Sequence, residues 1–156
     1  MTPLFKKLNF KDQKEILVIN APTSFDKELA DIAKFTEITK VIKKVKAIDF
    51  AIVFVLTRKE IDNAIDLIFP KLNGDAVFWF CYPKGTSKKY KCDFNRDTGW
   101  EILGNYNLEG VRQVAIDDDW SALRFRKTEY IKKLTRRESF AISKEGKERI
   151  KANPSR

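Results

Sequence analysis

The sequence predicts an α/β protein with a mostly parallel sheet, helices on both faces in a three-layer arrangement, and an antiparallel hairpin at its end. Two apolar runs without polar alternation, Asp49–Val55 and Ala76–Tyr82, are typical of strands buried on both faces. A helix that begins after Thr57 lies between them, and a strand–helix–strand series favours a parallel sheet. Residues 110–116 and 120–126 then form two more strands joined by a polar turn.

The chain begins with a strand and a short helix. Residues 15–20 are an apolar run that stops at Ala21-Pro22, which predicts a buried strand. The next residues, Thr23-Ser24-Phe25-Asp26, predict a helix start, with a hydroxyl cap and an acid at the positive end of the helix dipole. The apolar residues that share one face of this helix are Phe25, Leu29 and Ile32.

Residues 36–45 are a segment whose secondary structure the pattern leaves open. β-Branched side chains alternate irregularly with lysines there, and the apolar spacing fits a helix or a strand. We expect an edge strand, because lysines along an exposed edge discourage pairing with another chain.

A capping box marks the start of the central helix. Thr57 is followed three residues later by Glu60, the spacing at which each side chain bonds the backbone amide of the other. We expect Pro70 to end this helix and Asn73-Gly74-Asp75 to form a turn before a strand that starts at Ala76. The residues predicted on its buried face are Ile61, Ala64, Ile65 and Ile68.

A further helix is predicted after the central strand. Asp93 or Asn95 can cap a helix that runs to about Tyr106, with Trp100 and Leu103 toward the core. The tryptophans all lie on apolar faces, where core packing is the expected role and stacking on bases is the alternative. They are Trp79, Trp100 and Trp120.

The composition excludes several kinds of chemistry. The chain has no histidine, so it lacks the usual general base near neutral pH and any Ser-His-Asp or Cys-His mechanism. The spacing of its two cysteines, Cys81 and Cys92, matches no zinc or redox motif. We predict no catalytic residue, no metal site and no cofactor. The N-terminus has no apolar signal segment and no apolar run could span a membrane, which favours a cytoplasmic protein.

Positive charge is concentrated at the C-terminal end. Residues 124–156 carry twelve Lys and Arg against four Glu, whereas residues 1–123 carry nineteen against eighteen acids. We expect one α/β domain over residues 1–131 and a basic, partly disordered tail over 132–156. Such a tail predicts an acidic partner, with nucleic acid or an acidic protein as candidates, and a solubilising role is the alternative. The candidate polyanion-binding residues are Arg124, Arg126, Lys132, Lys133, Arg136 and Arg137.

The loop Lys84–Lys91 is the predicted anion-binding site. It leaves the carboxyl end of a central strand, where open α/β sheets bind ligands, and leads to the predicted helix N-terminus near Asn95. The candidate residues are Lys84, Thr86, Ser87, Lys88 and Arg96. A solvated loop with ordinary surface lysines is the alternative. Asp117-Asp118-Asp119 could bind Mg²⁺, but such a run is more typical of a polar turn.

From Asp49 onward, the order of strand, capped helix, turn, strand and terminal hairpin resembles the second half of a class I, Rossmann-like methyltransferase fold. The resemblance implies a nucleotide- or S-adenosylmethionine-type pocket at the ends of the first and central strands. The residues expected around it are Asn20, Ala21, Tyr82 and Lys84. The chain departs from the family where a glycine-rich cofactor loop follows the first strand, because Gly74 is its first glycine.

Three motifs, Phe78–Gly85, Asp93–Asp97 and Asp117–Arg126, resemble a family of uncharacterised bacterial proteins defined only as a domain of unknown function. This resemblance covers most of residues 8–127 and implies no activity. The sequence as a whole favours a non-enzymatic binding module that contacts an acidic partner through its tail and loop. The alternatives are a degenerate ligand pocket, with or without methyltransferase activity, and a structural protein that pairs through its apolar surface.

Overall fold

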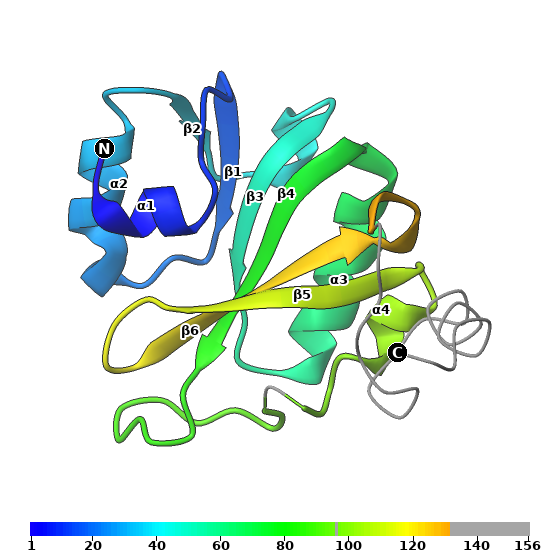
Figure 1. The fold of residues 1–156 in the computed structure, drawn as a ribbon. Coiled ribbons are helices and arrows are strands. Elements are labelled where there is room, and N and C mark those ends of the chain that lie inside the picture. The colour runs from blue at the N-terminus through cyan, green and yellow to red at the C-terminus, as the bar shows by residue number, and fades with distance from the viewer. Residues whose placement is uncertain (96, 132–156) are drawn as a thin grey trace, which may run out of the picture.

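The computed structural model describes residues 1–95 and 97–131, and its sheet has six strands (Figure 1). They are β1 (Glu15–Ile19), β2 (Glu37–Thr39), β3 (Ile48–Phe54), β4 (Leu72–Pro83), β5 (Leu108–Ala115) and β6 (Trp120–Lys127). Their order in space is β2-β1-β3-β4-β6-β5, with parallel pairing from β2 to β4 and antiparallel pairing of β6 with both β4 and β5. The fold is the predicted small Rossmann-like α/β sheet with a terminal antiparallel hairpin.

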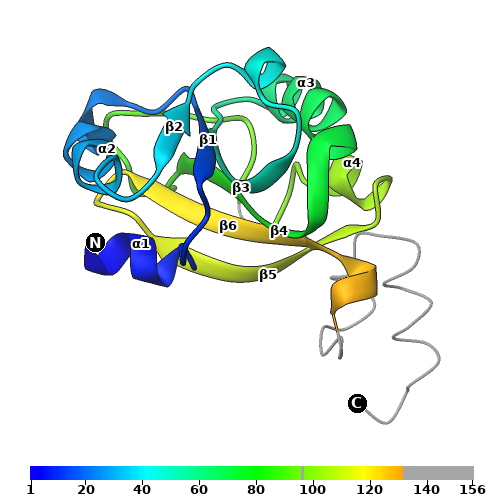
Figure 2. The ribbon, with the colours of Figure 1, turned by 90° about the horizontal axis from the view of Figure 1, so that it is seen from above.

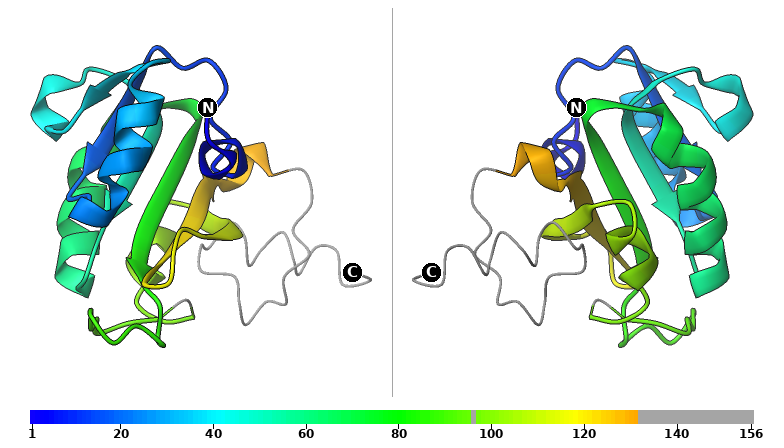
Figure 3. Two further views of the ribbon diagram at one scale, coloured as in Figure 1. Left: turned by 90° about the vertical axis from the view of Figure 1, so that its left-hand side faces the viewer. Right: turned by 90° about the vertical axis from the view of Figure 1, so that its right-hand side faces the viewer.

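Helices lie on both faces of the sheet, so the fold has three layers (Figures 2 and 3). They are α1 (Pro3–Lys7), α2 (Asp26–Ile32), α3 (Arg58–Ile68) and α4 (Glu101–Gly104), with 3₁₀ turns η1 (Thr23–Phe25), η2 (Ile42–Lys44), η3 (Phe69–Lys71) and η4 (Thr128–Tyr130). On one face, α1 and α2 pack in a cluster with Phe50 and Trp79. On the other, α3 and α4 pack in a cluster with Phe78 and Phe80. β4 is therefore buried on both faces, which explains its continuous apolar run.

The side chain of Trp79 ties the N-terminal segment to the sheet. Its indole Nε1 donates a hydrogen bond of 2.8 Å to the carbonyl oxygen of Leu8 in the buried core. The helix α1 is not apparent in the sequence, because five residues are too few to show a helical period. Thr2 caps this helix, and Phe5 and Leu8 are fully buried beneath it.

The predicted capping box of the central helix is confirmed. Glu60 Oε1 accepts a hydrogen bond of 3.1 Å from the Thr57 amide, and Thr57 Oγ1 accepts one of 3.1 Å from the Glu60 amide. The helix α3 ends at Ile68, and Pro70 lies in the 3₁₀ turn that follows. The predicted buried face is also confirmed, and its residues are Ile61, Ala64, Ile65 and Ile68.

The first half of the sheet corrects two details of the prediction. The turn η1 and the helix α2 begin without a side-chain cap, so the hydroxyls of Thr23 and Ser24 do not have the predicted capping role. The edge strand expected over residues 36–45 exists at the border of the sheet, but it is only the three residues of β2. Pairing with β1 stops at Thr39, and the chain then turns through η2.

Asn73-Gly74-Asp75 does not form a turn before the central strand, as predicted, but lies inside β4. Leu72 already pairs with Ile48, and the register shifts before the next pair. Gly74 has φ +54°, a conformation that glycine adopts without the strain other residues incur. The turn-forming residues therefore produce an irregularity within a longer strand.

The predicted helix from Asp93 or Asn95 to Tyr106 is wrong, since α4 contains only four residues. The Asn95 side chain instead accepts hydrogen bonds from the amides of Asp97 at 2.8 Å and Thr98 at 3.0 Å, which forms a local turn that competes with a helix. Asp93 does cap a helix, but a different one: its Oδ1 accepts a hydrogen bond of 2.9 Å from the amide of Arg58, the first residue of α3.

The hairpin of β5 and β6 confirms the two predicted strands. Leu123 and Phe125 lie in the core on the α3 side of the sheet, and the alternating Arg124 and Arg126 lie on the opposite face. Within residues 1–95 and 97–131, no helix is long and apolar enough to cross a membrane. The predicted tail, residues 132–156, lies outside the described residues.

Candidate functional site

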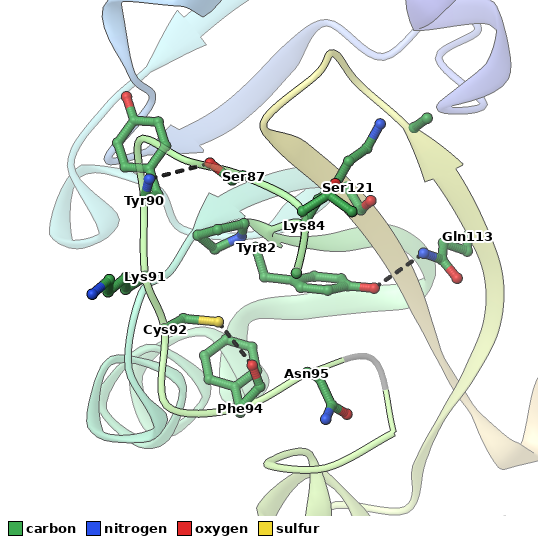
Figure 4. A pocket seen from close by; sticks show the side chains of 14 residues that line it. Tyr82, Lys84, Ser87, Tyr90, Lys91, Cys92, Phe94, Asn95, Gln113 and Ser121 are labelled. Atoms are coloured by element: carbon green, nitrogen blue, oxygen red, sulfur yellow. Dashed lines mark hydrogen bonds between the residues drawn. The ribbon is translucent and has the colours of Figure 1, made fainter.

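A cavity of about 930 Å³ lies where β4 ends, between the loop that follows it and the hairpin (Figure 4). Its lining residues are Tyr82, Pro83, Lys84, Gly85, Thr86, Ser87, Tyr90, Lys91, Cys92, Phe94, Asn95, Gln113, Ala115 and Ser121. These come from the end of β4, residues 84–95, the end of β5 and the start of β6. No residue of β1 or β3 is among them.

Aromatic side chains form much of the cavity wall. Tyr82 is almost fully buried, and its ring centroid lies 6.0 Å from that of Phe94 and 5.6 Å from that of Trp100. Its hydroxyl accepts a hydrogen bond of 3.1 Å from Gln113 Nε2, which joins the hairpin to β4 across the cavity (Figure 4). The cavity thus presents a fixed aromatic ring with a polar edge.

The charge of the lining is entirely positive. Lys84 is half-buried and Lys91 is exposed, and the lining contains no Asp or Glu. The backbone of Lys84 is bonded to the hairpin turn, since its amide donates a hydrogen bond of 2.8 Å to the carbonyl oxygen of Asp119. The lining therefore includes two lysines and no carboxylate, which favours an anion.

Ser87 is engaged in holding the loop rather than being free for a ligand. Its hydroxyl donates a hydrogen bond of 2.8 Å to Asp119 Oδ1 and accepts from the amides of Lys89 at 3.2 Å and Tyr90 at 3.1 Å. The predicted anion contact through Ser87 therefore competes with three existing hydrogen bonds. Thr86, also predicted, lines the cavity.

The acidic run Asp117-Asp118-Asp119 forms the hairpin turn. Asp117 Oδ1 accepts hydrogen bonds from the amides of Asp119 at 2.8 Å and Trp120 at 2.9 Å, the pattern of an Asx turn. Among the described residues, no group of three or more His, Cys, Asp or Glu side chains could hold a metal ion. The hydrogen bonds therefore support the polar turn and not the Mg²⁺ site.

The two cysteines lie in opposite environments. Cys92 is half-buried, lines the cavity, and donates a hydrogen bond of 2.8 Å from Sγ to the carbonyl oxygen of Phe94 (Figure 4). Cys81 is fully buried in β4; burial, and to a lesser degree the charge of Asp117, raises the pKa of its thiol. A thiol reagent should therefore reach Cys92 and not Cys81 in the folded protein.

The structure separates the predicted ligand residues. Tyr82 and Lys84 line the cavity together, whereas Asn20, with φ +57° after β1, and the exposed Lys88 do not line it. Arg96 lies outside the described residues, and the helix N-terminus expected beside it is absent, since residues 97–100 are not helical.

Sequence reasoning missed the contribution of the hairpin to the cavity. Gln113, Ala115 and Ser121 lie opposite the end of β4 only because β6 pairs with β4 so that Ser121 faces Tyr82, and β5 pairs with β6 so that Ala115 faces Ser121. Nothing in the local pattern of a hairpin specifies which residues of a distant strand it will face.

The topological switch point of the sheet, where open α/β sheets usually bind ligands, lies between β1 and β3. Aromatic side chains pack tightly next to it. Phe25 packs on Phe54 with ring centroids 5.1 Å apart, Phe54 on Trp120 at 5.1 Å, and Trp120 on Tyr90 at 4.9 Å. This aromatic row (Phe25, Phe54, Trp120 and Tyr90) crosses the carboxyl edge of the sheet and ends at the wall of the cavity.

The two residues of the hairpin that were predicted to bind a polyanion, Arg124 and Arg126, differ in their hydrogen bonds. Arg126 forms a two-point ion pair with Asp75, with hydrogen bonds of 2.9 and 2.6 Å. Arg124 is half-buried, and its Nε is enclosed without a hydrogen-bond partner in the part of the chain that is described. The remaining candidates lie outside the described residues, and they are Lys132, Lys133, Arg136 and Arg137.

No family model and no curated protein matches the chain. Among solved structures, N-methyltransferase NodS from Bradyrhizobium japonicum WM9 aligns with 16% identity and TM-score 0.47, over 80% of this chain and 91% of that one. A putative type 11 methyltransferase from Sulfolobus solfataricus aligns with 9% identity and TM-score 0.46, over 87% and 98%. A protein of the NADB-Rossmann superfamily from Streptococcus agalactiae aligns with 8% identity and TM-score 0.45, over 81% and 68%.

Alignments this weak assign neither a family nor a function to the chain, and the fold assignment rests on the strand order and directions of the sheet. The Rossmann-like layout that the sequence predicted is confirmed. Membership in the uncharacterised bacterial family stays a prediction.

Proposed function

We propose that this protein binds a small anionic molecule with a planar ring, of the nucleotide type, in the cavity at the end of β4. The observation that carries the proposal is the composition of the lining, which combines aromatic rings with two lysines and no carboxylate. The cavity volume of about 930 Å³ lies within the roughly 300–1,000 Å³ of ordinary ligand pockets. It lies at the carboxyl edge of the parallel strands, the edge at which open α/β sheets bind ligands, although not at the switch point itself.

Each part of such a ligand has a counterpart in the lining. The rings of Tyr82, Phe94 and Tyr90 offer faces or edges for a planar ring. Gln113 and Ser121 add hydrogen-bonding groups on the hairpin side, and ammonium groups suit a phosphate or carboxylate.

The charge distinguishes two ligands of similar size. S-adenosylmethionine carries a positive sulfonium, for which the lining supplies no carboxylate, and the segment after β1 has no glycine to let a ligand approach its backbone. A nucleoside phosphate matches the two lysines better. We therefore expect adenine nucleotides to bind more tightly than S-adenosylmethionine.

Thermal-shift and calorimetric titrations with AMP, ATP, S-adenosylmethionine and inorganic phosphate test the proposal. We expect Lys84→Gln and Lys91→Gln each to weaken nucleotide binding by roughly five- to tenfold, the size of a lost charge-assisted contact. Lys88→Gln is the matched control, because Lys88 belongs to the same loop, has the same charge and lies outside the cavity. Equal effects of all three substitutions, or no binding of any of the ligands, would refute the cavity as the site.

Thiol labelling gives an independent measurement. Because Cys92 lines the cavity and Cys81 is buried, one thiol of the native protein should react quickly and the other only on unfolding. A ligand in the cavity should slow the fast reaction in proportion to its occupancy. If saturating nucleotide leaves the Cys92 rate unchanged, the nucleotide binds elsewhere.

The charge distribution favours a second function, and we propose that residues 124–156 contact a polyanion, with nucleic acid as the first candidate. The supporting observation is the excess of twelve Lys and Arg over four Glu in this segment. Anisotropy titrations of duplex DNA and RNA across a salt series compare the full chain with one that ends at Ile131, since Thr128 and Ile131 are buried and belong to the fold. We expect the salt dependence to be steep for the full chain and weaker after truncation, and equal binding by both chains would contradict the proposal.

A further inference from the structure

Three arginines gather on the hairpin face opposite Leu123 and Phe125. Arg112 of β5 and Arg124 of β6 are directly opposite in register, and Arg126 lies two residues farther along β6 on the same face. The pKa of Arg124 is lowered, first by burial and then by the charge of Arg126; Asp75 opposes this shift, and Arg112 adds the smallest lowering effect. The charge of Arg124 is therefore close enough to those of Arg126 and Arg112 to be repelled by both.

The neighbouring carboxylates lie at one end of this cluster. Asp75 makes two hydrogen bonds to Arg126, which raise the pKa of that guanidinium. Glu109 pairs with Arg126 in the register of the hairpin and is buried. Asp75 therefore holds Arg126 in place, whereas its hydrogen bonds do not reach Arg112 or Arg124.

Arg124 is half-buried and Arg112 is exposed, and their like charges lie opposite each other in the hairpin. Neither side chain donates a hydrogen bond to another of the described residues, and Arg124 Nε is enclosed. Like charges directly opposite in a sheet are destabilising, and a partly buried charge without a partner is costly. A group that accepts hydrogen bonds from both guanidiniums would relieve both effects.

We propose that Arg112 and Arg124 together bind a phosphate group. The guanidinium fork matches two phosphate oxygens at once, and two forks on opposite strands can share one tetrahedral anion. Neither residue lines the cavity, so this site is separate from the proposed nucleotide pocket. Arg126, held by Asp75, forms one border of the site. The phosphate can come from a free anion or from a nucleic-acid backbone.

Titration of the full-length protein with inorganic phosphate at low ionic strength, followed by the arginine Nε–H resonances in NMR, tests this site. We expect a saturable shift of the Arg124 resonance, assigned by its loss in Arg124→Lys. Arg112→Gln, Arg124→Gln and Arg124→Lys should each weaken phosphate binding at least about tenfold, the last because lysine keeps the charge but loses the fork.

Two control variants make every outcome decisive. Lys27→Gln removes one positive charge from the exposed surface of α2 and should leave phosphate affinity within about twofold, since a distant surface charge is screened. Equal weakening by Lys27→Gln and Arg124→Gln, or the absence of saturable binding, overturns the site. Loss of phosphate binding in Lys84→Gln but not in Arg124→Gln also overturns it and assigns the anion to the cavity. Thermal unfolding of Arg124→Gln checks folding, and we expect it to be at least as stable as the parent, since an unpaired charge is removed.

A short oligothymidylate distinguishes the two sources of phosphate. If its binding depends on Arg112 and Arg124 and it competes with inorganic phosphate, the site serves a nucleic-acid backbone. If its binding is independent of both arginines while inorganic phosphate still needs them, the site serves a free phosphate.

Discussion

The carboxyl edge of the sheet is closely packed beside the switch point and hollow one strand farther along. Between β1 and β3, Phe25 and Phe54 pack ring against ring in the aromatic row. Beyond β4, the edge opens into a cavity of about 930 Å³. Both places follow the end of a parallel strand, so strand direction alone does not decide where a ligand can enter.

The segments that follow the strands explain the difference. After β1, Pro22 and η1 return the chain to the sheet at once and place Phe25 in the core. After β4, residues 84–95 and 97–100 cross the edge without a helix, and their hydrogen bonds run within the loop, to the hairpin turn at Asp119 and, at Asp93, to the start of α3. A long loop that satisfies its own polar groups leaves space that a helix would fill with side chains.

Removing a ring from the aromatic row beside the switch point should give the largest effect on stability. Phe54→Ala removes a buried ring from the middle of the aromatic row, and we expect a loss of about 4 kcal/mol in the free energy of unfolding. Urea unfolding measures it. A loss below about 1 kcal/mol would mean that the row is loosely packed, and that the edge beside the switch point does not differ in packing from the edge beyond β4.

A substitution at Gly99, in the loop beside the cavity, should lower the free energy of unfolding somewhat less than Phe54→Ala. Gly99 has φ +92°, and a Cβ there would lie 2.4 Å from Cβ of Phe94, a lining residue. We expect Gly99→Ala to destabilise by about 2–3 kcal/mol, from backbone strain and overpacking. Gly85→Ala is the control, because a methyl group added there would have no atom within 4 Å, and it should change stability little. Similar losses for both variants would show that the loop tolerates neither and would remove the special role of Gly99.

Removing the hydroxyl that links β4 to the hairpin should have a modest effect. Tyr82→Phe deletes the acceptor of the Gln113 hydrogen bond, and we expect a loss of about 0.5–1.5 kcal/mol, measured by thermal and urea unfolding. Gln113→Leu should give a similar loss, and the double variant should fall short of the sum of the two. Additive losses would indicate that the two side chains act independently.

A large side chain placed in the cavity should scarcely change stability. Ala115 is exposed, lies on a strand and lines the cavity, so Ala115→Trp should leave the free energy of unfolding within about 0.5 kcal/mol. Nucleotide affinity should fall at least about tenfold, because the indole occupies the ligand volume. Unaltered affinity by calorimetry would place the ligand outside the cavity.

The accuracy of the sequence predictions varied along the chain for physical reasons. The capping box at Thr57 and the apolar run from Ala76 to Tyr82 were predicted because both signals are local and unambiguous. The helix expected after Asn95 was wrong because the Asn95 side chain satisfies the amides of a turn and the Asp93 carboxylate caps α3 instead. Both residues are also ordinary helix caps, so their sequence does not reveal which backbone amides they bind.

The sequence located part of the cavity lining. Tyr82, Lys84 and Thr86, predicted as ligand residues, line the cavity at the end of the central strand, since the carboxyl edge of a parallel sheet is defined by topology. Asn20 was expected beside them but lies outside the cavity, because side chains and not strand ends determine where space remains. The contributions of Gln113 and Ser121 depend on hairpin register, which no local pattern reports.

The sequence by itself determined the fold class, most strands, the central helix and the sign of the charge, because periodicity, capping and composition act over a few residues. Only the tertiary structure decided that the switch point is closely packed, that the cavity lies between β4 and the hairpin, and that Arg112 faces Arg124 across the hairpin. Those features depend on which distant side chains meet, and their volumes and charges compete for the same space only after the chain has folded.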